Sequence, residues 1–246
     1  MRIVVVGATS AIAEHCCRLW LQREAVDLML VARDTAKAGR IAQDLRVRSP
    51  ASMVTVVEAD FLDPVSIGRT ADQAAAAGPI DIVLIAHGTL PVQSVCENDL
   101  LVCRETLEVN AVSPALFAEA FASHLARAGR GTLAIIGSVA GDRGRKANYT
   151  YGASKGLIAR YAEGLEHRFA GTGVSVVLIK PGPTDTPMAA PQKAQGRKLA
   201  SVEDVARATV RGIDRKRPVV YAPAEWALIM LILRHLPRFV FNRLQI

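Results

Sequence analysis

The sequence predicts an α/β fold in which helices cover both faces of a parallel sheet. Short apolar runs typical of buried strands alternate with longer stretches typical of helices. The 246 residues are 50% hydrophobic but only 5% aromatic, a composition that suits a sheet buried on both faces. Because the chain has the length of one large domain and contains no linker or repeat, we expect a single Rossmann-type, doubly wound domain.

Seven strands are expected, all parallel, because a helical stretch separates each strand from the next. The predicted strands are residues 2–6, 26–32, 53–58, 81–86, 132–137, 174–180 and 218–222. The predicted helices are residues 11–22, 34–48, 64–77, 98–127, 149–170 and 201–216. Within the domain of residues 1–222, the polar stretch 184–198 contains two prolines and a glycine and is expected to form a mobile flap. Residues 223–246 form a separate apolar and basic tail.

The charge and cysteine content narrow the classes of ligand and location. The formal net charge of +7 suits a phosphorylated ligand, an anionic membrane surface or nucleic acid. No nucleic-acid motif supports the last of these, so we expect no nucleic-acid partner. The opening residues RIVVVGATSAI lead into a folded motif without a secretory signal, which favours a cytoplasmic protein. The four cysteines are Cys16, Cys17, Cys96 and Cys103, and their spacing matches neither a zinc-binding motif nor a redox motif. We therefore expect reduced, buried thiols and no metal site.

A tyrosine and a lysine four residues apart form the most informative motif of the chain. Tyr151 and Lys155 lie one turn apart on a predicted helix, so the lysine charge favours ionisation of a phenol that otherwise titrates at about pH 10. Ser138 ends the preceding strand and can hydrogen-bond a substrate oxygen while the tyrosine transfers a proton. With Asn110 upstream, this grouping is typical of carbonyl reduction or its reverse, provided that a hydride carrier binds beside it.

A turn suited to a dinucleotide follows the first strand. Its sequence GATSAIA opens the first predicted helix, whose N-terminal N–H groups can hold a pyrophosphate. Ala11 and Ala13 replace two expected glycines. Alanine is an accepted variant at the last position of the motif, occupied here by Ala13, whereas the Ala11 methyl group lies where the dinucleotide approaches closely. The residues of this turn expected to contact the cofactor are Gly7, Thr9, Ser10, Ala11 and Ile12.

The residue after the second strand favours NADP(H) over NAD(H). An acidic side chain at this position binds the ribose 2′-hydroxyl group of NAD and repels the 2′-phosphate of NADP. This chain has Arg33 there, and a guanidinium favours the phosphate. The next residue, Asp34, suits the N-cap of a helix. Use of NAD(H) stays open, because Arg33 also suits a solvated loop charge, although NADP(H) is favoured.

In their order along the chain, these motifs resemble the classical short-chain dehydrogenase/reductase family over residues 1–188. Asp60 in EADFLD resembles the family's aspartate near the adenine ring, and His87 departs from the family's Asn-Ala-Gly at residues 86–88. Pro181-Gly182 followed by Thr186 matches the segment that approaches the nicotinamide. The cofactor contacts that the resemblance implies are Asp60, Phe61, Ala86, His87, Gly88, Tyr151, Lys155, Pro181, Gly182, Thr184 and Thr186.

The resemblance also implies catalytic roles. Tyr151 would be the general acid in reduction, and Lys155 would lower its pKa and bind the nicotinamide-ribose hydroxyl groups. Ser138 would orient the carbonyl oxygen, and Asn110 would hold a water molecule of the proton relay. Ser138 also suits a strand-end cap, and Asn110 a side chain at a helix kink.

The tail combines apolar and basic residues. Its apolar run WALIMLIL is far shorter than the roughly 20 residues that span a bilayer. Basic residues follow this run, interspersed with Leu, Phe and Val; they are Arg234, His235, Arg238 and Arg243. This pattern suits an interfacial helix or a site for a lipid phosphate, and it equally suits a tail that packs on the core or across a dimer interface.

The tail and the run AGDRGRKANYTYGASK at 140–155 resemble the reductases of the decaprenylphosphoryl-ribose 2′-epimerase pairs. Those reductases act on the 2-keto group of a polyprenyl-phosphate-linked pentose that a flavin oxidase has formed. The resemblance implies a lipid-linked keto-sugar substrate, a flavin oxidase partner and a peripheral position on the inner face of the membrane. Arg143, Arg145 and Lys146 would then lie near the site and meet a phosphate, unless they form an exposed loop.

The leading interpretation is an NADPH-dependent reductase of a lipid-linked or otherwise activated keto-sugar in cell-envelope polysaccharide synthesis. One alternative is a generic reductase or dehydrogenase of small ketones, alcohols or acyl thioesters. Another is a non-catalytic cofactor-sensing protein, which the intact Tyr151 and Lys155 disfavour. Because the family usually assembles through the helices predicted at 98–127 and 149–170, we expect a homodimer or homotetramer.

Overall fold

Seven parallel strands form one sheet in the computed structural model, which describes residues 1–244. The strands are β1 (Arg2–Val6), β2 (Asp27–Ala32), β3 (Met53–Glu58), β4 (Ile82–Ile85), β5 (Gly131–Ile136), β6 (Val174–Pro181) and β7 (Val219–Ala222). Their order in the sheet is β3-β2-β1-β4-β5-β6-β7, so the direction of winding reverses between β1 and β4. The predicted fold class is correct, and each predicted strand end agrees with the structure to within one residue.

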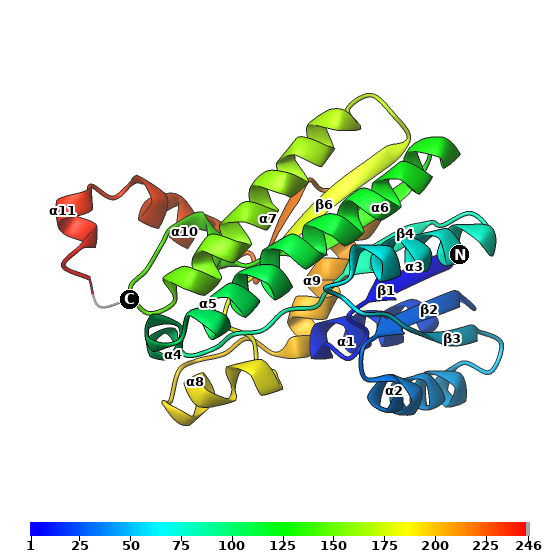
Figure 1. Cartoon of the computed structure of the whole chain (residues 1–246), viewed down its shortest axis with the longest axis horizontal. Helices are drawn as coiled ribbons and strands as arrows, with labels where there is room; N and C mark the ends of the chain where they lie inside the picture. Colours follow the sequence, from blue (N-terminus) through cyan, green and yellow to red (C-terminus); the bar gives the residue numbers. More distant parts are fainter. Residues whose placement is uncertain (245–246) are drawn as a thin grey trace.

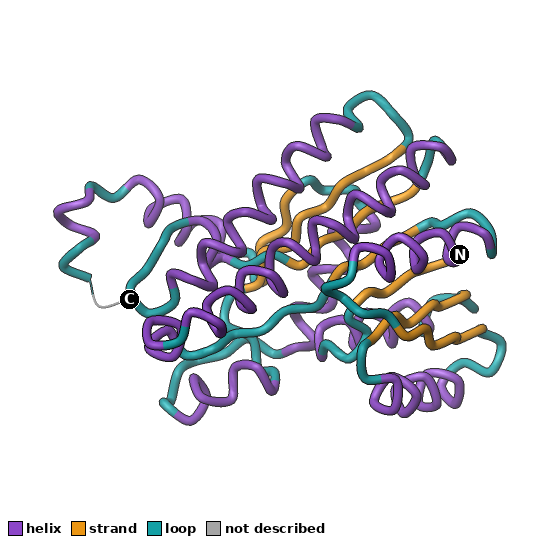
Figure 2. Tube along the Cα trace, in the orientation of Figure 1, coloured by secondary structure: helices purple, strands orange, loops and turns teal. Residues whose placement is uncertain are grey.

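Helices cover both faces of the sheet (Figures 1 and 2). They are α1 (Ala11–Leu21), α2 (Thr35–Arg48), α3 (Pro64–Ala76), α4 (Gln93–Asn98), α5 (Leu100–Leu107), α6 (Ser113–Ala128), α7 (Tyr149–Arg168), α8 (Ala190–Ala194), α9 (Val202–Asp214), α10 (Glu225–His235) and α11 (Arg238–Phe241). Three short segments with π or 3-10 geometry are η1 (Glu108–Val112), η2 (Val139–Asp142) and η3 (Pro187–Ala189). Helices α1, α2 and α9 pack on one face, and α3, α6 and α7 pack on the other.

The alternation of side chains along each strand divides the core into two clusters. On β1, Ile3 and Val5 pack towards α1, α2 and α9, whereas Val4 and Val6 pack towards α3, α6 and α7. All four side chains are fully buried. Since both faces of the sheet are covered, the strands are continuous apolar runs, which is why they could be located from the sequence.

The cysteines match the prediction of buried thiols in three of four cases. Cys16, Cys17 and Cys96 are buried and Cys103 is partly buried, all as free thiols. Burial raises the pKa of the Cys17 thiol to about 12, so this group is protonated at neutral pH.

The helix predicted over residues 98–127 is divided into α4, α5, η1 and α6, and α4 already begins at residue 93. Asp99 has an extended backbone, with φ −135° and ψ 105°. Its carboxylate accepts hydrogen bonds from the N–H groups of Leu101 and Val102, which caps a new helix. The π-helical segment η1 then interrupts the regular pattern before α6. Apolar periodicity does not detect such breaks, because apolar residues continue on both sides of them.

The predicted flap and tail both contain short helices. The flap holds η3 and α8, and Thr184 forms an isolated parallel bridge with Ala200. The tail forms α10 and α11 at one end of the molecule (Figure 1). Met230 is buried, whereas Leu231 and Ile232 are each 55% exposed. Across residues 1–244, no helix combines the length and apolar character that a membrane crossing requires.

Candidate active site

A cleft of about 840 Å³ opens where the strands of the sheet end. Its walls come from residues that follow β1 to β6, and the flap forms part of its rim. In open α/β sheets, ligands bind at the carboxyl ends of the strands, where the strand order reverses. The volume lies in the upper part of the range of small-molecule sites, about 300–1,000 Å³. The cleft therefore has the position and size of a binding site for a cofactor together with a substrate.

The turn between β1 and α1 requires glycine at position 7. Gly7 has φ +81°, and a Cβ atom there would lie 2.6 Å from the backbone nitrogen of His87. Helix α1 begins at Ala11, and its N-cap residue Ser10 makes no side-chain capping hydrogen bond. Both residues border the cleft together with Ile12. The N-terminus of α1 is thus open to an anion such as a pyrophosphate.

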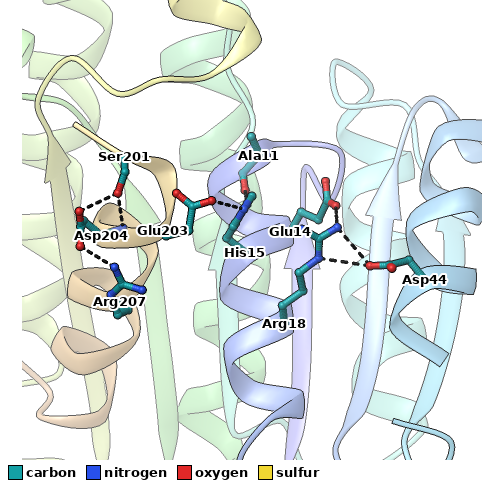
Figure 3. A network of polar contacts seen from close by, with 9 residues as sticks. All are labelled: Ala11, Glu14, His15, Arg18, Asp44, Ser201, Glu203, Asp204 and Arg207. Atoms are coloured by element: carbon teal, nitrogen blue, oxygen red, sulfur yellow. Dashed lines mark hydrogen bonds and ion pairs between the residues drawn. The ribbon is translucent and has the colours of Figure 1, made fainter. Parts of the chain in front are cut away.

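Polar contacts on two sides fix the direction of α1 (Figure 3). His15 Nε2 lies 3.2 Å from Glu203 Oε1 of α9, and Arg18 Nη2 lies 3.1 Å from Asp44 Oδ2 of α2. Glu14 borders the cleft, and its Oε1 lies 2.5 Å from Arg18 Nη2. These contacts hold α1 between its neighbours and pair the Glu14 carboxylate with a cation.

Two cations border the cleft where β2 ends. Arg33 is exposed, and its guanidinium carbon lies 5.9 Å from the centroid of the Phe61 ring. Within residues 1–244, it forms no ion pair. Asp34 caps α2, because its carboxylate accepts a hydrogen bond from the Lys37 N–H group at 2.8 Å. Since Lys37 also borders the cleft, this corner presents two positive charges that suit a phosphate.

Asp60 does not border the cleft, contrary to the prediction. Its carboxylate accepts a hydrogen bond from the Leu62 N–H group at 2.9 Å, and its own N–H group donates to Ser66 Oγ at 2.9 Å. These bonds order the loop before α3, while the neighbouring Phe61 forms the wall of the cleft. The motif located the correct loop, but the direction of a side chain within it depends on local hydrogen bonds.

His87 is a partly buried, neutral residue beside the end of β4. Its Nε2 lies 2.9 Å from Ser113 Oγ, and its ring packs edge-on against Phe61 with 4.7 Å between centroids. The Nδ1 atom is buried and has no hydrogen-bond partner in the described chain. Burial, followed by the charges of Lys155 and Arg33, lowers the pKa of His87 to about 3. The imidazole therefore carries no charge at physiological pH.

Ser138 and Tyr151 border the cleft between β5 and α7. The Ser138 hydroxyl accepts a hydrogen bond from the Ala140 N–H group at 3.1 Å, so it also caps η2. Burial raises the pKa of Tyr151 above its ordinary value of 10.0, while hydrogen bonding with Ser138 and the charge of Arg145 act in the opposite direction. The phenol is therefore protonated at neutral pH and able to donate a proton.

Lys155 is a buried cation that hydrogen-bonds the end of β5. Its Nζ donates to the Ile136 carbonyl oxygen at 3.1 Å, and burial lowers its pKa to about 8. The Nζ atom lies 5.8 Å from the centroid of the Tyr151 ring. Among charged groups, Arg145 is the one that lowers the Tyr151 pKa in the protein alone. The expected action of Lys155 on this pKa stays a prediction.

Asn110 lies in η1, and its side chain holds backbone groups. Its Oδ1 accepts a hydrogen bond from the Thr89 N–H group at 2.9 Å. Its Nδ2 donates to the carbonyl oxygens of Thr89 and Thr106, each at 2.9 Å. A Cβ atom at Gly88 would lie 2.6 Å from Asn110 Oδ1, so the glycine makes this contact sterically acceptable. Both amide hydrogens are occupied, as expected for a side chain at a helix kink.

The turn after β6 is covered by the tail. A Cβ atom at Gly182 would lie 2.1 Å from Nε1 of Trp226, so the indole packs directly against this glycine. Thr184 Oγ1 donates a hydrogen bond to the Gly182 carbonyl oxygen at 2.9 Å, which tightens the entry into the flap. Pro181 and Thr186 border the cleft with these two residues.

The basic residues before α7 have different surroundings. Arg145 borders the cleft, whereas Arg143 is bound to the tail. Arg143 Nη1 donates hydrogen bonds to the carbonyl oxygens of Leu233 and, at 2.8 Å, Leu236. Its guanidinium carbon lies 3.7 Å from the centroid of the Phe241 ring. Only Arg145 of the predicted basic cluster therefore reaches the cleft.

This one cleft brings together all but one of the predicted site residues. Those that border it are Gly7, Thr9, Ser10, Ala11, Ile12, Arg33, Phe61, Ala86, His87, Gly88, Asn110, Ser138, Tyr151, Lys155, Pro181, Gly182, Thr184 and Thr186. Others that border it were not singled out from the sequence, among them Lys37, Leu90, Asn148, Met188, Gln192 and Arg197. Met188, Gln192 and Arg197 lie in the flap, where no motif marks them.

Known proteins similar in sequence are oxidoreductases. The family model for the short chain dehydrogenase matches residues 1–197. An uncharacterized oxidoreductase of Streptomyces coelicolor is 32% identical over 245 residues, which cover 98% of this chain and 95% of the relative. An uncharacterized oxidoreductase of Mycobacterium tuberculosis is 32% identical over 249 residues, which cover 98% and 96%.

Solved structures share the fold over the whole chain. A short-chain dehydrogenase from Sphingobium yanoikuyae in complex with NADPH has a TM-score of 0.84 and 22% identity, with 99% of this chain and 96% of that one covered. A short-chain dehydrogenase from Burkholderia cenocepacia in complex with NADP has a TM-score of 0.82 and 22% identity, with 100% and 97% covered. Because the family model matches most of the chain and the sequence relatives span nearly all of it, this protein belongs to the short-chain dehydrogenase family of oxidoreductases.

Proposed function

We propose that this oxidoreductase reduces a carbonyl group to an alcohol, with NADPH as the hydride donor and Tyr151 as the proton donor. The observation that carries the proposal is the wall shared by Ser138, Tyr151 and Lys155, in the same cleft as the glycine turn and the N-terminus of α1. Proton donor and dinucleotide cradle thus open into one space, as carbonyl reduction requires.

The cleft fits a dinucleotide at its β1 and β2 end. Gly7 leaves room at the turn, and the uncapped Ser10 and the N-terminus of α1 are available to a pyrophosphate. Arg33 and Lys37 supply cations for a 2′-phosphate, which favours NADPH over NADH. The two solved relatives described above were each determined with this cofactor in its reduced or oxidised form, which supports the same choice. When bound, NADPH supplies the hydride.

The remaining wall residues suit the other parts of the dinucleotide. Around the adenine and its ribose we assign Phe61, Ala86, His87 and Gly88, all of which border the cleft, in place of Asp60, which does not. Towards the nicotinamide we assign Pro181, Gly182, Thr184 and Thr186, which follow β6.

Tyr151 and Ser138 act on the carbonyl oxygen. Because its pKa is raised by burial, the Tyr151 hydroxyl holds its proton at neutral pH and transfers it to the oxygen as the carbonyl is reduced. Ser138 donates a hydrogen bond to the same oxygen and so orients the carbonyl. Arg145 lowers the Tyr151 pKa and thereby favours the phenolate that the transfer leaves behind.

Lys155 and Asn110 support these groups. The Lys155 ammonium group, held by the Ile136 carbonyl oxygen, borders the cleft and is available to ribose hydroxyl groups of the cofactor. The Asn110 amide is occupied by Thr89 and Thr106, so a relay water at this residue would bind to its backbone rather than to its side chain. We therefore assign the Asn110 side chain the task of holding the loop after β4.

The substrate that we propose is a lipid-linked or otherwise activated keto-sugar. This rests on the sequence resemblance and on the tail, where Leu231 of α10 and Phe239 of α11 are 55% and 69% exposed beside exposed basic residues such as Arg238. Apolar and basic groups on one short helical segment suit the surface of an anionic membrane. We thus propose a cytoplasmic enzyme that contacts the inner face of the membrane through α10 and α11, with a flavin oxidase as the enzyme that forms its ketone.

A homodimer or homotetramer through the long helices is part of the proposal. Apolar side chains are exposed on α5, α6 and α7, with Leu100 81%, Leu116 37% and Leu157 47% exposed. A second copy that packs against these helices would bury them, as is usual for exposed apolar patches.

The test is NADPH consumption on a panel of keto-sugars, free and lipid-linked, together with simple ketones. The proposal expects NADPH to be oxidised fastest with a lipid-linked keto-sugar and expects an alcohol product. Faster turnover of simple ketones would favour a generic reductase. Binding of NADPH without consumption on any member of the panel would favour a cofactor-sensing protein.

A further inference from the structure

Arg145 is an incompletely paired cation in the wall of the cleft. It lies in the loop between η2 and α7, and its charge acts on the Tyr151 hydroxyl group, so the guanidinium is within electrostatic reach of the proposed proton donor. Its Nε atom is buried without a hydrogen-bond partner in residues 1–244. A buried donor without a partner is costly, and guanidinium groups in proteins usually find an acceptor.

Arg197 brings a second positive charge to the same cleft from the flap. The two guanidinium groups are close enough that the charge of Arg197 lowers the pKa of Arg145, second only to burial. Across the described residues, neither arginine forms an ion pair with a carboxylate. Two positive charges therefore border the same cleft, and no carboxylate of the described residues forms an ion pair with either of them.

The acidic residues of the cleft are engaged elsewhere. Only Glu14 and Asp34 among the residues bordering the described cleft are acidic. Glu14 is paired with Arg18, and Asp34 caps α2. Both belong to the α1 and α2 end of the cleft, whereas Arg145 precedes α7. The charge at the Tyr151 end is thus left for a ligand to neutralise.

Asn148 adds a polar group to this part of the wall. It lies three residues after Arg145, borders the cleft and has a buried Oδ1 atom without a partner among the described residues. An amide oxygen in this position accepts a hydrogen bond from a ligand hydroxyl group. A ligand that carries both a hydroxyl group and an anionic group would therefore satisfy Asn148 and the two arginines together.

We propose that Arg145 and Arg197 bind an anionic group of the substrate, a phosphate or a carboxylate, while its carbonyl group meets Tyr151. The inference rests on the proposed function, because it places the anion on the molecule that is reduced. Guanidinium groups recognise both anions through paired N–H donors. Because Arg197 belongs to the flap and Arg145 to the body of the domain, the anion also links the flap to the body when the substrate binds.

The test is anion binding to the full-length protein saturated with NADP⁺, measured by calorimetry with inorganic phosphate and, separately, with acetate. One of the two anions should bind wild type, and Arg145→Met and Arg197→Met should each weaken that binding by about tenfold or more. The choice between the two anions identifies the group on the substrate. Lys198→Met is the matched control, since it removes the same charge beside Arg197 from a residue that does not border the cleft.

Three results would overturn the inference. The first is that neither anion binds wild type, and the second is that Lys198→Met weakens binding as much as Arg197→Met. The third is that the arginine variants lose affinity for NADP⁺ by the same factor, which would assign the pair to the cofactor. Unchanged NADP⁺ affinity also reports that the variants are folded. Since the measurement needs no turnover, a failure here is distinguishable from a failure of carbonyl reduction, which Tyr151→Phe tests separately.

Discussion

The Nζ atom of Lys155 lies 3.1 Å from the carbonyl oxygen of Ile136, the residue two positions before Ser138. This hydrogen bond joins α7 to the end of β5, so the helix that carries Tyr151 and the strand that leads to Ser138 are held in one arrangement. It also keeps the ammonium group in a buried position, where its charged form is disfavoured.

The buried position of Lys155 predicts a pH dependence for cofactor capture. Burial lowers the Lys155 pKa from 10.5 to about 8, so the free enzyme loses this positive charge as the pH rises through about 8. Because kcat/KM reports ionisations of the free enzyme, kcat/KM for NADPH should fall above that pH. Lys155→Arg keeps its charge and should shift the fall to higher pH. The same profile in both proteins would contradict this assignment.

His87 predicts a stability difference at acid pH. Its pKa is about 3 in the folded protein and 6.5 ordinarily, so below pH 6.5 the unfolded chain binds a proton that the folded protein does not. This contribution to stability is present above pH 6.5 and is lost as the pH falls. Between pH 7 and pH 5, the loss amounts to about 2 kcal/mol. In urea unfolding, the free energy of unfolding should fall between pH 7 and pH 5 by about 2 kcal/mol less in His87→Asn than in wild type. An equal fall in both proteins would contradict the role of His87 in this pH dependence.

Arg33 predicts the choice of cofactor. Arg33→Asp removes a cation and adds a carboxylate that repels the 2′-phosphate, so KM for NADPH should rise by about tenfold or more while KM for NADH does not. Arg40→Asp makes the same charge change at an exposed position outside the cleft and should leave both values unchanged. An unaltered NADPH preference in Arg33→Asp would remove Arg33 from the cofactor site.

The exposed apolar residues of the tail predict membrane binding. Leu231→Glu and Phe239→Glu should each weaken sedimentation with vesicles that contain phosphatidylglycerol by about tenfold, because an exposed apolar group that enters the lipid is replaced by an anion. Val47→Glu, at a residue of α2 that is 77% exposed, is the control and should not change it. If wild type does not sediment with the vesicles, α10 and α11 are not a membrane contact.

The sequence was sufficient for the sheet but not for the long helix. The strands are buried on both faces and are therefore apolar runs with clear ends. The breaks within residues 93–128 depend on the cap at Asp99 and on the hydrogen bonds between Asn110 and Thr89, which is 21 residues away. Contacts over such a separation follow from the fold and leave no local pattern.

The site was predictable where a motif fixes the position of a residue along a strand or helix. Ser138, Tyr151 and Lys155 meet in the cleft because a strand end and the following helix carry them. Asp60 and Arg143 do not border the cleft. The Asp60 carboxylate is engaged by a hydrogen bond within its loop, and Arg143 donates to carbonyl oxygens at the end of α10. The approach of the flap to the body of the domain likewise depends on tertiary packing.

Replacement of Tyr151 by phenylalanine tests the central claim most directly. The change removes one hydroxyl group from the wall of the cleft and leaves the ring. With the best ketone of the panel, kcat should fall by about a hundredfold to ten-thousandfold, the usual contribution of a general acid, while the Kd for NADPH stays nearly unchanged. A Tyr151→Phe enzyme that reduces the ketone at the wild-type rate would contradict the account.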